Sequence, residues 1–352
     1  MPRIRSVATA LPPYTLPQEQ IRDLARAHFA PAFPDIDRYL TVFRHAQIDS
    51  RAFAAPLEWF AIPRSFKECN DLFIEVATGL GEQAARAALA AAGLEPGDVD
   101  HLIWVSTTGM AAPSPDATLI NRLGMGRHTR RTPVWGLGCA GGVAGLARAT
   151  EYTRAFPDQR VLLISAELCS VTFQWNDQSK RNLIASSLFA DGVAAVLVEG
   201  DQAAGADTSL SILGTQSTLW PDTTEIMGWD MVDTGMQVVF SSRIPQIVQT
   251  LMRDNVAEFL AGHNLTIDDI DHWILHPGGA KVISAYEGAL AIDRERLDHT
   301  REVLRQHGNM SSATVFFVLE EFLKAGTPAP GEFGVLAVLG PGFSCELALV
   351  RG

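Results

Sequence analysis

One cysteine, Cys139, lies among glycines in the segment 138–142, at the predicted start of a helix. A helix start presents unpaired N–H groups and the positive end of the helix dipole, both of which stabilise a thiolate, and glycines let a substrate approach the backbone. These features predict a nucleophile with a depressed pKa. A cysteine in a stretch rich in alanine and glycine also fits a small buried apolar residue, so the segment alone leaves both interpretations open.

Two polar residues far downstream favour the nucleophile. His276 precedes a Pro-Gly-Gly segment, and Asn309 lies between Gly308 and Met310. A cysteine with a distant histidine and asparagine is typical of a catalytic group assembled by the fold. Each residue alone has a structural alternative, a buried core histidine for His276 and a helix N-cap for Asn309. Together with Cys139 they predict a catalytic triad.

An internal repeat separates the histidines into two groups. Residues 94–105 (LEPGDVDHLIWV) and 265–276 (LTIDDIDHWILH) share Leu, Asp, Asp, His and Ile at an offset of 171 residues (265 minus 94). His101 and His272 match across the repeat, which favours a role in the fold for both. His276 has no histidine counterpart in the first copy, as a catalytic residue requires.

The same repeat relates the cysteine to the asparagine. Segment 138–142 aligns with segment 308–312 at an offset of 170 residues (308 minus 138), and an apolar helical run follows each. Cys139 and Asn309 therefore occupy equivalent positions in two halves of the chain. A pseudo-twofold axis between the halves would bring both helix starts, and His276, together at their centre.

Composition narrows the class of protein. The chain has 352 residues, 47% of them hydrophobic and 19% charged, as in an ordered globular protein with a large core. A net charge of -12 argues against nucleic acid as a partner. No apolar run approaches the 18 residues typical of a membrane span. The cysteines form no C-x-x-C pair or zinc pattern, which predicts free thiols in a reducing cytoplasm; they are Cys69, Cys139, Cys169 and Cys345.

Strands alternating with helices predict an α/β protein of two similar halves, residues 1–203 and 204–352, joined by a linker at 200–207. The predicted strands are 100–106, 132–136, 160–165, 191–198, 209–217, 271–276, 333–339 and 344–350. The predicted helices lie within 17–44 and at 70–92, 116–124, after Cys139, and at 243–262, 279–290 and 310–324. A tight turn at Pro341-Gly342 joins the last two strands, where the first half has a longer excursion, 168–188, of the kind that shapes a binding cavity.

At these motifs the chain resembles, over nearly its whole length, the chalcone synthase family, the type III polyketide synthases of the thiolase superfamily. The resemblance implies a homodimer of duplicated αβαβα thiolase-fold subunits. It also implies that Cys139 is the nucleophile, that His276 and Asn309 are its partners, and that Phe189 is an aromatic wall beside them. The matching segments are GCAGG (138–142), FADG (189–192), WILHPGG (273–279), GNMSSA (308–313) and GPGFS (340–344).

The chemistry implied by this resemblance needs no metal or redox cofactor. An acyl-CoA starter acylates Cys139, malonyl-CoA loses CO2, and donors from His276 and Asn309 stabilise the enolate as an oxyanion hole does. The enolate attacks the cysteine thioester, and ring closure releases the product. The residues expected to line the substrate pocket are Phe189, Thr107, Ala112, Cys169, Thr172, Val238, Gly340, Pro341, Gly342, Phe343 and Ser344.

Three residues that differ from those of plant chalcone synthases bear on which substrate the pocket accepts. Plant chalcone synthases have a bulky Phe at the position of Val238, a Thr at Cys169, and a Met that reaches across the dimer at Ala112. Smaller or more apolar residues there predict a wider, apolar pocket, and the run from Met227 to Phe240 is more similar to bacterial enzymes that use fatty acyl starters. We therefore expect a long-chain acyl-CoA starter and alkylpyrone or alkylresorcinol products.

Other functions stay open. A tetrahydroxynaphthalene-type synthase that uses malonyl-CoA alone is the main rival within the family. A ketoacyl synthase III-like condensing enzyme shares the fold and the triad, but it typically has an Asn shortly after the histidine and a glycine-rich end that this chain lacks. A non-catalytic lipid-binding protein on the thiolase fold predicts loss of a triad residue, and none is lost. The cations expected to hold the phosphates of CoA are Arg38, Arg44, Arg243 and Lys281.

Overall fold

The computed structural model describes residues 1–203 and 210–352. The strands are β1 (Arg3–Ala10), β2 (Tyr14–Pro17), β3 (Ser50–Phe53), β4 (His101–Ser106), β5 (Arg130–Trp135), β6 (Arg160–Leu168), β7 (Asp191–Glu199), β8 (Leu210–Leu219), β9 (Met227–Val232), β10 (Gly235–Phe240), β11 (His272–Leu275), β12 (Phe333–Gly340) and β13 (Ser344–Arg351). The α-helices are α1 (Gln18–Phe29), α2 (Ile36–His45), α3 (Phe66–Ala92), α4 (Pro115–Leu123), α5 (Gly141–Ala155), α6 (Lys180–Leu188), α7 (Ile244–Ala261), α8 (Ala280–Leu290), α9 (Asp298–His307) and α10 (Thr314–Lys324).

A nine-stranded sheet with the order β11-β12-β13-β8-β1-β7-β6-β4-β5 contains the repeat. In the first half β4 runs parallel to β6, and β7 and then β1 follow antiparallel. In the second half β11 runs parallel to β12, and β13 and then β8 follow antiparallel. The two sets meet where β1 pairs with β8, so the predicted duplication is present as a repeated pairing pattern.

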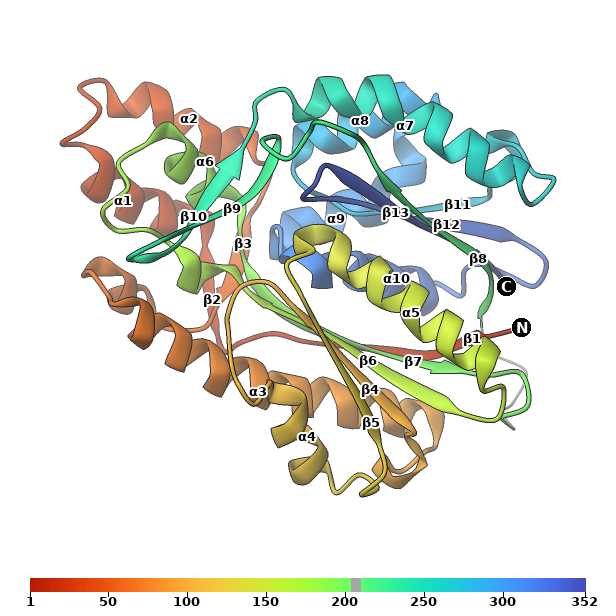
Figure 1. Cartoon of the computed structure of the whole chain (residues 1–352). Helices are drawn as coiled ribbons and strands as arrows, with labels where there is room; N and C mark the ends of the chain where they lie inside the picture. The colour runs from red at the N-terminus through yellow and green to blue at the C-terminus, as the bar shows by residue number, and fades with distance from the viewer. Residues whose placement is uncertain (204–209) are drawn as a thin grey trace.

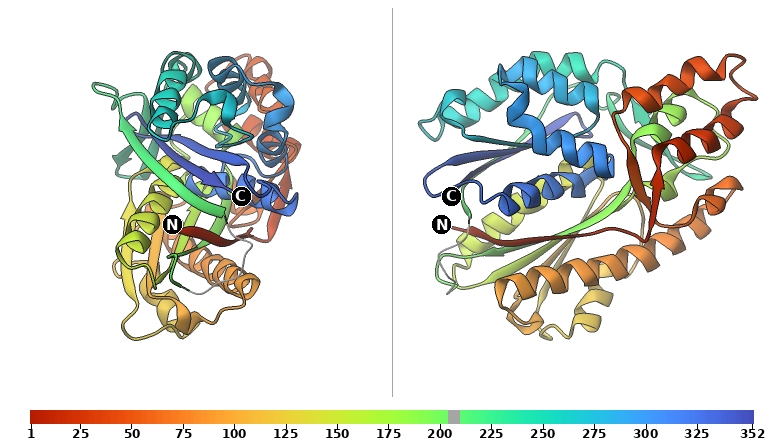
Figure 2. Two further views of the ribbon diagram at one scale, coloured as in Figure 1. Left: turned by 90° about the vertical axis from the view of Figure 1, so that its right-hand side faces the viewer. Right: turned by 180° about the vertical axis from the view of Figure 1, so that it is seen from behind.

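Five layers result from this arrangement, as the αβαβα prediction requires (Figures 1 and 2). Helices α5 and α10 lie between the two halves of the sheet and share one apolar core with both of them. Helix α3 covers the outer face of the first half, and α7, α8 and α9 cover the outer face of the second. Strands covered on both faces have no solvated side, which explains the continuous apolar runs at β6 and β7.

Most predicted elements are present with small shifts at their ends. Helix α3 begins before the predicted residue 70 because Ser65 caps it, accepting a hydrogen bond from the Glu68 backbone while the Glu68 carboxylate accepts from Ser65 in return. It ends at Gly93, whose φ of 70° lies in the left-handed region that terminates helices. The predicted linker at 200–207 and the boundary at 203–204 fall partly outside the described residues, and the division at that point stays a prediction.

Two additions to the repeated frame were not predicted as a helix or as strands. Helix α6 lies inside the predicted excursion after β6, and it packs with α1 and α2 in a helical group that has its own apolar core. Strands β9 and β10 form a separate hairpin beside this group (Figure 1). Within residues 1–203 and 210–352, neither addition has a counterpart in the other half.

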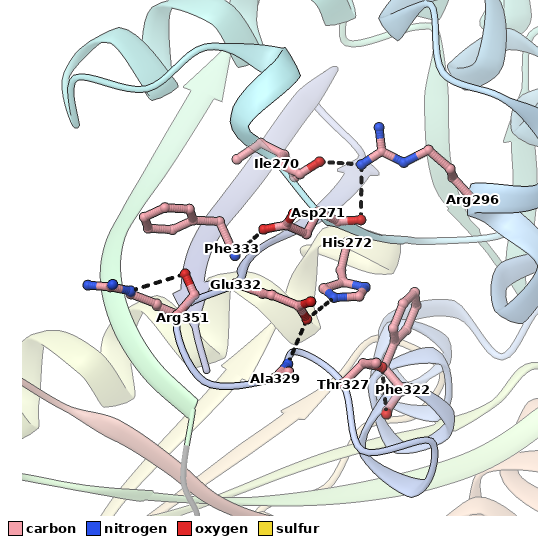
Figure 3. A network of polar contacts seen from close by, with 11 residues as sticks. Ile270, Asp271, His272, Arg296, Phe322, Thr327, Ala329, Glu332, Phe333 and Arg351 are labelled. Carbon is pink, nitrogen blue, oxygen red and sulfur yellow. Dashed lines mark hydrogen bonds and ion pairs between the residues drawn. The ribbon is translucent and has the colours of Figure 1, made fainter.

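His101 and His272, the histidines that match across the repeat, serve the fold as predicted. The His101 ring lies 2.8 Å from the hydroxyl of Thr132 on the neighbouring strand. The His272 ring lies 2.7 Å from the Glu332 carboxylate, which also accepts a hydrogen bond from the Ala329 backbone and so fixes the turn before β12 (Figure 3). Among the described helices, none combines the length and the apolar composition that a membrane span requires.

Candidate active site

Cys139 lies in a short 3-10 turn, Gly138–Ala140, directly before α5. Gly138 has a φ of 49°, and its N–H donates to the Thr107 hydroxyl at 2.9 Å. A side chain at Gly142 would place its Cβ 2.3 Å from the Ser312 carbonyl oxygen. The glycine therefore lets the turn that carries Cys139 pack directly on the matching turn of the second half.

Asn309 connects the elements of the site. Its backbone N–H donates to the Leu188 carbonyl at 2.9 Å, and its own carbonyl accepts from the Ala190 N–H at 2.8 Å, so it is paired with Phe189 as a β-bridge. Its side-chain Nδ2 donates to the Gly278 carbonyl at 3.2 Å, and a side-chain hydrogen bond from Asn309 to the sulfur of Cys139 favours the thiolate. One amide thus joins the cysteine turn to the loop that follows His276.

His276 directly follows β11 and is 2% exposed. Neither ring nitrogen has a hydrogen-bond partner among the described residues. Burial lowers the pKa of His276 to about 3, so the ring is neutral and carries one N–H donor and one acceptor. A buried imidazole with both nitrogens unpaired is available to a substrate or to the cysteine proton.

The predicted depressed pKa of Cys139 is wrong for the structure as it stands. Burial raises the pKa of Cys139 to about 12, outweighing the hydrogen bonds from Ser311 and Asn309 that favour the thiolate. The negative charge of Glu167 acts in the same direction as burial. Desolvation of the buried sulfur therefore exceeds the effect of the helix start, and the resting groups are a neutral thiol and a neutral imidazole.

Glu167, at the end of β6, ties the two halves together beneath the site. One carboxylate oxygen accepts from the backbone N–H groups of Thr107 and Thr108 at 3.0 and 3.1 Å, and the other accepts from the Ser312 hydroxyl. Burial raises the pKa of Glu167 to about 6 despite these donors. The network holds Thr107 where it accepts from the backbone of the cysteine turn.

The carbonyl of Phe189 is fixed by a buried charge. Arg51, on β3, is 0% exposed, and its Nη1 donates to the Phe189 carbonyl at 2.6 Å while its Nε donates to Gln18 at 3.0 Å. Burial lowers the pKa of Arg51 to about 9, and the nearby carboxylate of Asp191 acts in the opposite direction. Phe189 is the aromatic residue predicted to lie beside the triad. Arg51 thus holds its backbone on the side opposite its bridge with Asn309.

Two cavities adjoin these residues. The outer cavity has a volume of about 1170 Å³ and reaches the triad region through Thr107, Gly136 and Gly278. The inner cavity has a volume of about 70 Å³, and Cys169, Thr172, Phe189 and Val238 border it. Most of the remaining inner wall is aromatic or aliphatic.

Comparison with known proteins identifies this arrangement. The two domains of the chalcone and stilbene synthase family match the sequence of this chain. The N-terminal domain matches residues 61–202, and the C-terminal domain matches residues 211–352. The chain belongs to the chalcone and stilbene synthase family. It is therefore a type III polyketide synthase, an acyltransferase that performs decarboxylative Claisen condensation, on a thiolase fold.

Individual members of the family are similar over almost their whole length. A putative chalcone synthase of Bacillus subtilis is 43% identical, covering 98% of this chain and 97% of the relative. A 1,3,6,8-tetrahydroxynaphthalene synthase of Streptomyces peucetius is 41% identical, covering 99% and 92%. The crystal structure of 1,3,6,8-tetrahydroxynaphthalene synthase from Streptomyces coelicolor, a bacterial type III polyketide synthase, superimposes with a TM-score of 0.94 at 28% identity, covering 100% of this chain and 99% of the other.

Other residues predicted for the pocket of this synthase lie in different places. Pro341 and Gly342 border the outer cavity. Gly340 packs on the cysteine turn, where an added Cβ would lie 2.4 Å from that of Ala140. Phe343 stacks on Trp220 at 5.7 Å, and the Ser344 hydroxyl donates to the Pro341 carbonyl. Neither residue borders the outer or the inner cavity. Ala112 is exposed on the loop after β4 and borders neither cavity.

The predicted CoA-binding cations divide into two groups. Arg243 and Lys281 border the mouth of the outer cavity, together with Lys180 and Arg181 of α6, which the sequence analysis does not name. Arg38 and Arg44 are exposed on α2 and border neither cavity.

Sequence reasoning also missed Glu167 and Arg51. Glu167 carries a usable signal, a lone carboxylate at the end of an otherwise apolar buried strand. Arg51 carries none, because its position depends on β3, which was not predicted.

Proposed function

We propose that this synthase transfers an apolar acyl starter from CoA to Cys139 and extends it with malonyl-CoA, the leading starters being long-chain fatty acyl groups and the products alkylpyrones or alkylresorcinols. The observation that carries the proposal is the apolar inner cavity beside Phe189 and Cys169. A hydrocarbon tail gains about 0.8 kcal/mol for each methylene group buried in such surroundings. No metal or redox cofactor takes part.

In the loading step the neutral thiol of Cys139 and the neutral imidazole of His276 act together. The sulfur of Cys139 attacks the thioester carbonyl of the acyl-CoA while the acceptor nitrogen of His276 takes the thiol proton. The tetrahedral intermediate expels the CoA sulfur, which receives that proton and leaves as the free thiol. The raised pKa of Cys139 and the lowered pKa of His276 support this concerted transfer rather than a preformed ion pair.

In the extension step the same residues act as donors. The bond between the malonyl methylene carbon and its carboxylate breaks, CO2 leaves, and the electron pair forms an enolate on the CoA thioester. The N–H of His276 and the amide of Asn309 donate to the enolate oxygen, and each such donor lowers the barrier by about 3–4 kcal/mol. The enolate carbon then attacks the Cys139 thioester and expels the thiolate.

A second candidate is the use of malonyl-CoA alone, as in a tetrahydroxynaphthalene-type synthase. Two observations favour it. The relative from Streptomyces peucetius bears that name at 41% identity, and the inner cavity of about 70 Å³ has little room for a long tail without movement of its walls. The two candidates differ in the starter and share the loading site, the triad and the extension chemistry.

The mouth of the outer cavity supports binding of a CoA phosphate group. Lys180, Arg181, Arg243 and Lys281 gather there although the whole chain is acidic. Arg243 lies 3.6 Å from Glu225, whereas Arg181 and Lys281 have no ion-pair partner among the described residues. Unpaired cations are the ones available to phosphates. We assign the phosphates to this rim, with Arg38 and Arg44 as the alternative.

A homodimer and a cytoplasmic location complete the proposal. Strand β5 ends the nine-stranded sheet, and Trp135 on it is 49% exposed, as expected of an edge that a second copy covers. The exposed Ala112 loop would then face the partner's site. Free Cys69, Cys139, Cys169 and Cys345 suit a reducing compartment. Light scattering after size-exclusion chromatography tests the dimer.

Incubation with labelled malonyl-CoA, with and without acyl-CoA starters from C2 to C18, followed by mass spectrometry of the products, decides between the starters. We expect products that contain the added acyl chain, and Val238→Phe should reduce kcat/KM for long starters far more than for acetyl-CoA. Products built from malonyl units alone, with unused starters, would establish the second candidate. If Val238→Phe instead lowers kcat/KM equally for starters of every chain length, Val238 supports the fold rather than lining the acyl-chain site.

A further inference from the structure

Helix α1 contributes one face to the wall of the inner cavity. Four of its residues border the cavity at the spacing of a single helical face: Ile21, Leu24, Ala25 and His28. Three of them are apolar, and His28 is the polar exception, although it is only 8% exposed. A histidine on the buried face of a helix either serves the fold or faces a ligand, and its hydrogen-bond partners distinguish the two roles.

The partners of His28 set it apart from the rest of this wall. Its Nε2 lies 3.1 Å from Nε2 of Gln178, and this amide is its one hydrogen-bond partner among the described residues. The Oε1 atom of the same amide is buried, and no described residue pairs with it. The pair of His28 and Gln178 therefore keeps hydrogen-bonding capacity that the protein does not use. The other polar side chains that border the cavity all donate to groups of the protein itself: Arg51, Ser170, Thr172, Asn182 and Ser186.

Aromatic rings surround His28. The ring centroids of Phe29, Phe173 and Trp175 lie 4.6, 5.2 and 4.4 Å from that of His28. Phe173 and Trp175 also border the inner cavity. Burial lowers the pKa of His28, which favours the neutral ring with one N–H donor and one acceptor nitrogen. A neutral ring in aromatic surroundings suits an uncharged polar group rather than an anion.

His28 lies on the side of the inner cavity away from the triad. Helix α1 belongs to the helical group at one side of the molecule, whereas α5 and α10, which follow Cys139 and Asn309, lie at its centre (Figure 1). The inner cavity borders Cys169 and Phe189 as well as α1. In the proposed function the acyl chain starts from a thioester at Cys139 and enters this cavity past Phe189. The far end of the chain then approaches His28.

We propose that His28 is a binding site for a hydroxyl group at the far end of the acyl starter, so that ω-hydroxyacyl-CoA is a substrate class of this enzyme. The inference rests on the proposed function, in which the chain starts from Cys139. A hydroxyl group fits the neutral ring in either tautomer, because it donates to the acceptor nitrogen or accepts from the N–H. An unsubstituted chain leaves the ring unpaired, and a carboxylate meets no opposite charge there.

Paired starters of equal length test this site. The readout is the ratio of kcat/KM for ω-hydroxyacyl-CoA to that for the unsubstituted acyl-CoA with the same number of carbons, from C6 to C16, with product masses. In the wild type the ratio should exceed one at the length that reaches His28. His28→Phe keeps an aromatic ring and should lower that ratio about tenfold, the effect of one lost hydrogen bond.

Leu24→Ala is the matched control, because Leu24 borders the same cavity from the same helix face and carries no polar group. It should change kcat/KM for both starters alike and leave their ratio unchanged. A wild-type ratio below one at every length would overturn the assignment. So would a ratio in His28→Phe within about threefold of the wild type, or an equal fall in Leu24→Ala. Melting temperatures establish folding, and if His28→Phe does not fold, the wild-type ratios decide.

CoA release by the wild type separates this inference from the proposed function. A wild type that turns over no acyl-CoA of either kind refutes the proposed function before any variant is compared. A wild type that uses unsubstituted starters and disfavours the hydroxylated ones at every length keeps the proposed function and overturns only the role of His28.

Discussion

The two helix starts at the centre of the molecule share a plan and carry different side chains. Each follows a glycine with positive φ, 49° at Gly138 and 73° at Gly308, and each passes through a 3-10 turn into a buried helix. The first carries Cys139 and the second Asn309. The duplicated frame therefore supplies position, and chemistry arises where the copies differ, as it does where His276 follows β11.

The connection between β6 and β7 and the one between β12 and β13 differ more than the two helix starts do. Residues 169–190 join β6 to β7, whereas residues 341–343 join the equivalent β12 to β13. The longer connection contains α6 and contributes Cys169, Thr172 and Phe189 to the inner cavity and Lys180 and Arg181 to the mouth of the outer one. The short turn contributes Pro341 and Gly342 at one edge. The first half thus builds most of the inner cavity, whereas the second half lines most of the outer cavity and supplies two of the three residues predicted for the triad.

The first helix start differs from the second in carrying Cys139, and replacing this residue should have the largest effect on activity. Cys139→Ala should abolish elongation, because no thioester forms, and leave the melting temperature within a few degrees, because alanine is close to cysteine in volume. Product formation from malonyl-CoA and an acyl-CoA starter measures it. Cys69→Ala is the control and should retain activity. Elongation by Cys139→Ala at a comparable rate would remove Cys139 as the nucleophile.

Removing the matching side chain of the second helix start should cost less. Asn309→Ala loses the amide donor to the enolate and should lower kcat for condensation about 10²–10³-fold, while Cys139 still becomes acylated. Single-turnover loading with labelled acyl-CoA and steady-state condensation separate the two steps. If loading falls as much as condensation, Asn309 serves the nucleophile rather than the enolate, and the proposed division of roles between the halves fails.

The enclosure of the first helix start makes a prediction about pH. Because burial raises the pKa of Cys139 to about 12, its thiolate fraction should rise about tenfold per pH unit through neutral pH, and alkylation by iodoacetamide about a hundredfold from pH 6 to pH 8. Peptide mapping by mass spectrometry reports each cysteine, and Cys69, whose pKa burial raises to about 11, provides the comparison. A rate at Cys139 that is already maximal at pH 6 would indicate an ion pair with His276.

The repeated frame was predictable from the sequence because its signals are local. Continuous apolar runs, the cap and terminal glycine of α3, and the matched segments 94–105 and 265–276 each specify an element or a relation between elements. The hairpin and α6 were not predictable in the same way. Leu183 of α6 packs in the helical group, and Met227 and Phe240 at the ends of the hairpin pack against the core of the second half. Neither element belongs to the main sheet, so no strong periodic pattern distinguishes it.

The proximity of Cys139 and Asn309 was predictable from the sequence, whereas the electrostatics of Cys139 were not. Equivalence within the repeat placed Cys139 beside Asn309 without knowledge of any contact. The direction of the pKa shift at Cys139 depends on how completely the sulfur is enclosed, and burial is a property of the assembled halves rather than of segment 138–142.

The smallest expected effect comes from replacing a cation that binds the CoA phosphates. This replacement tests whether the longer connection, residues 169–190, contributes to the mouth of the outer cavity as well as to the wall of the inner one. Arg181→Gln, on α6, should raise KM for malonyl-CoA about threefold to tenfold with little change in kcat, since loss of one phosphate contact weakens the ground and transition states equally. Arg44→Ala, on α2, is the matched comparison and should leave KM within twofold, because Arg44 borders neither cavity. The opposite pattern would return the phosphates to α2, as the sequence predicts, and confine the role of the longer connection to the inner cavity.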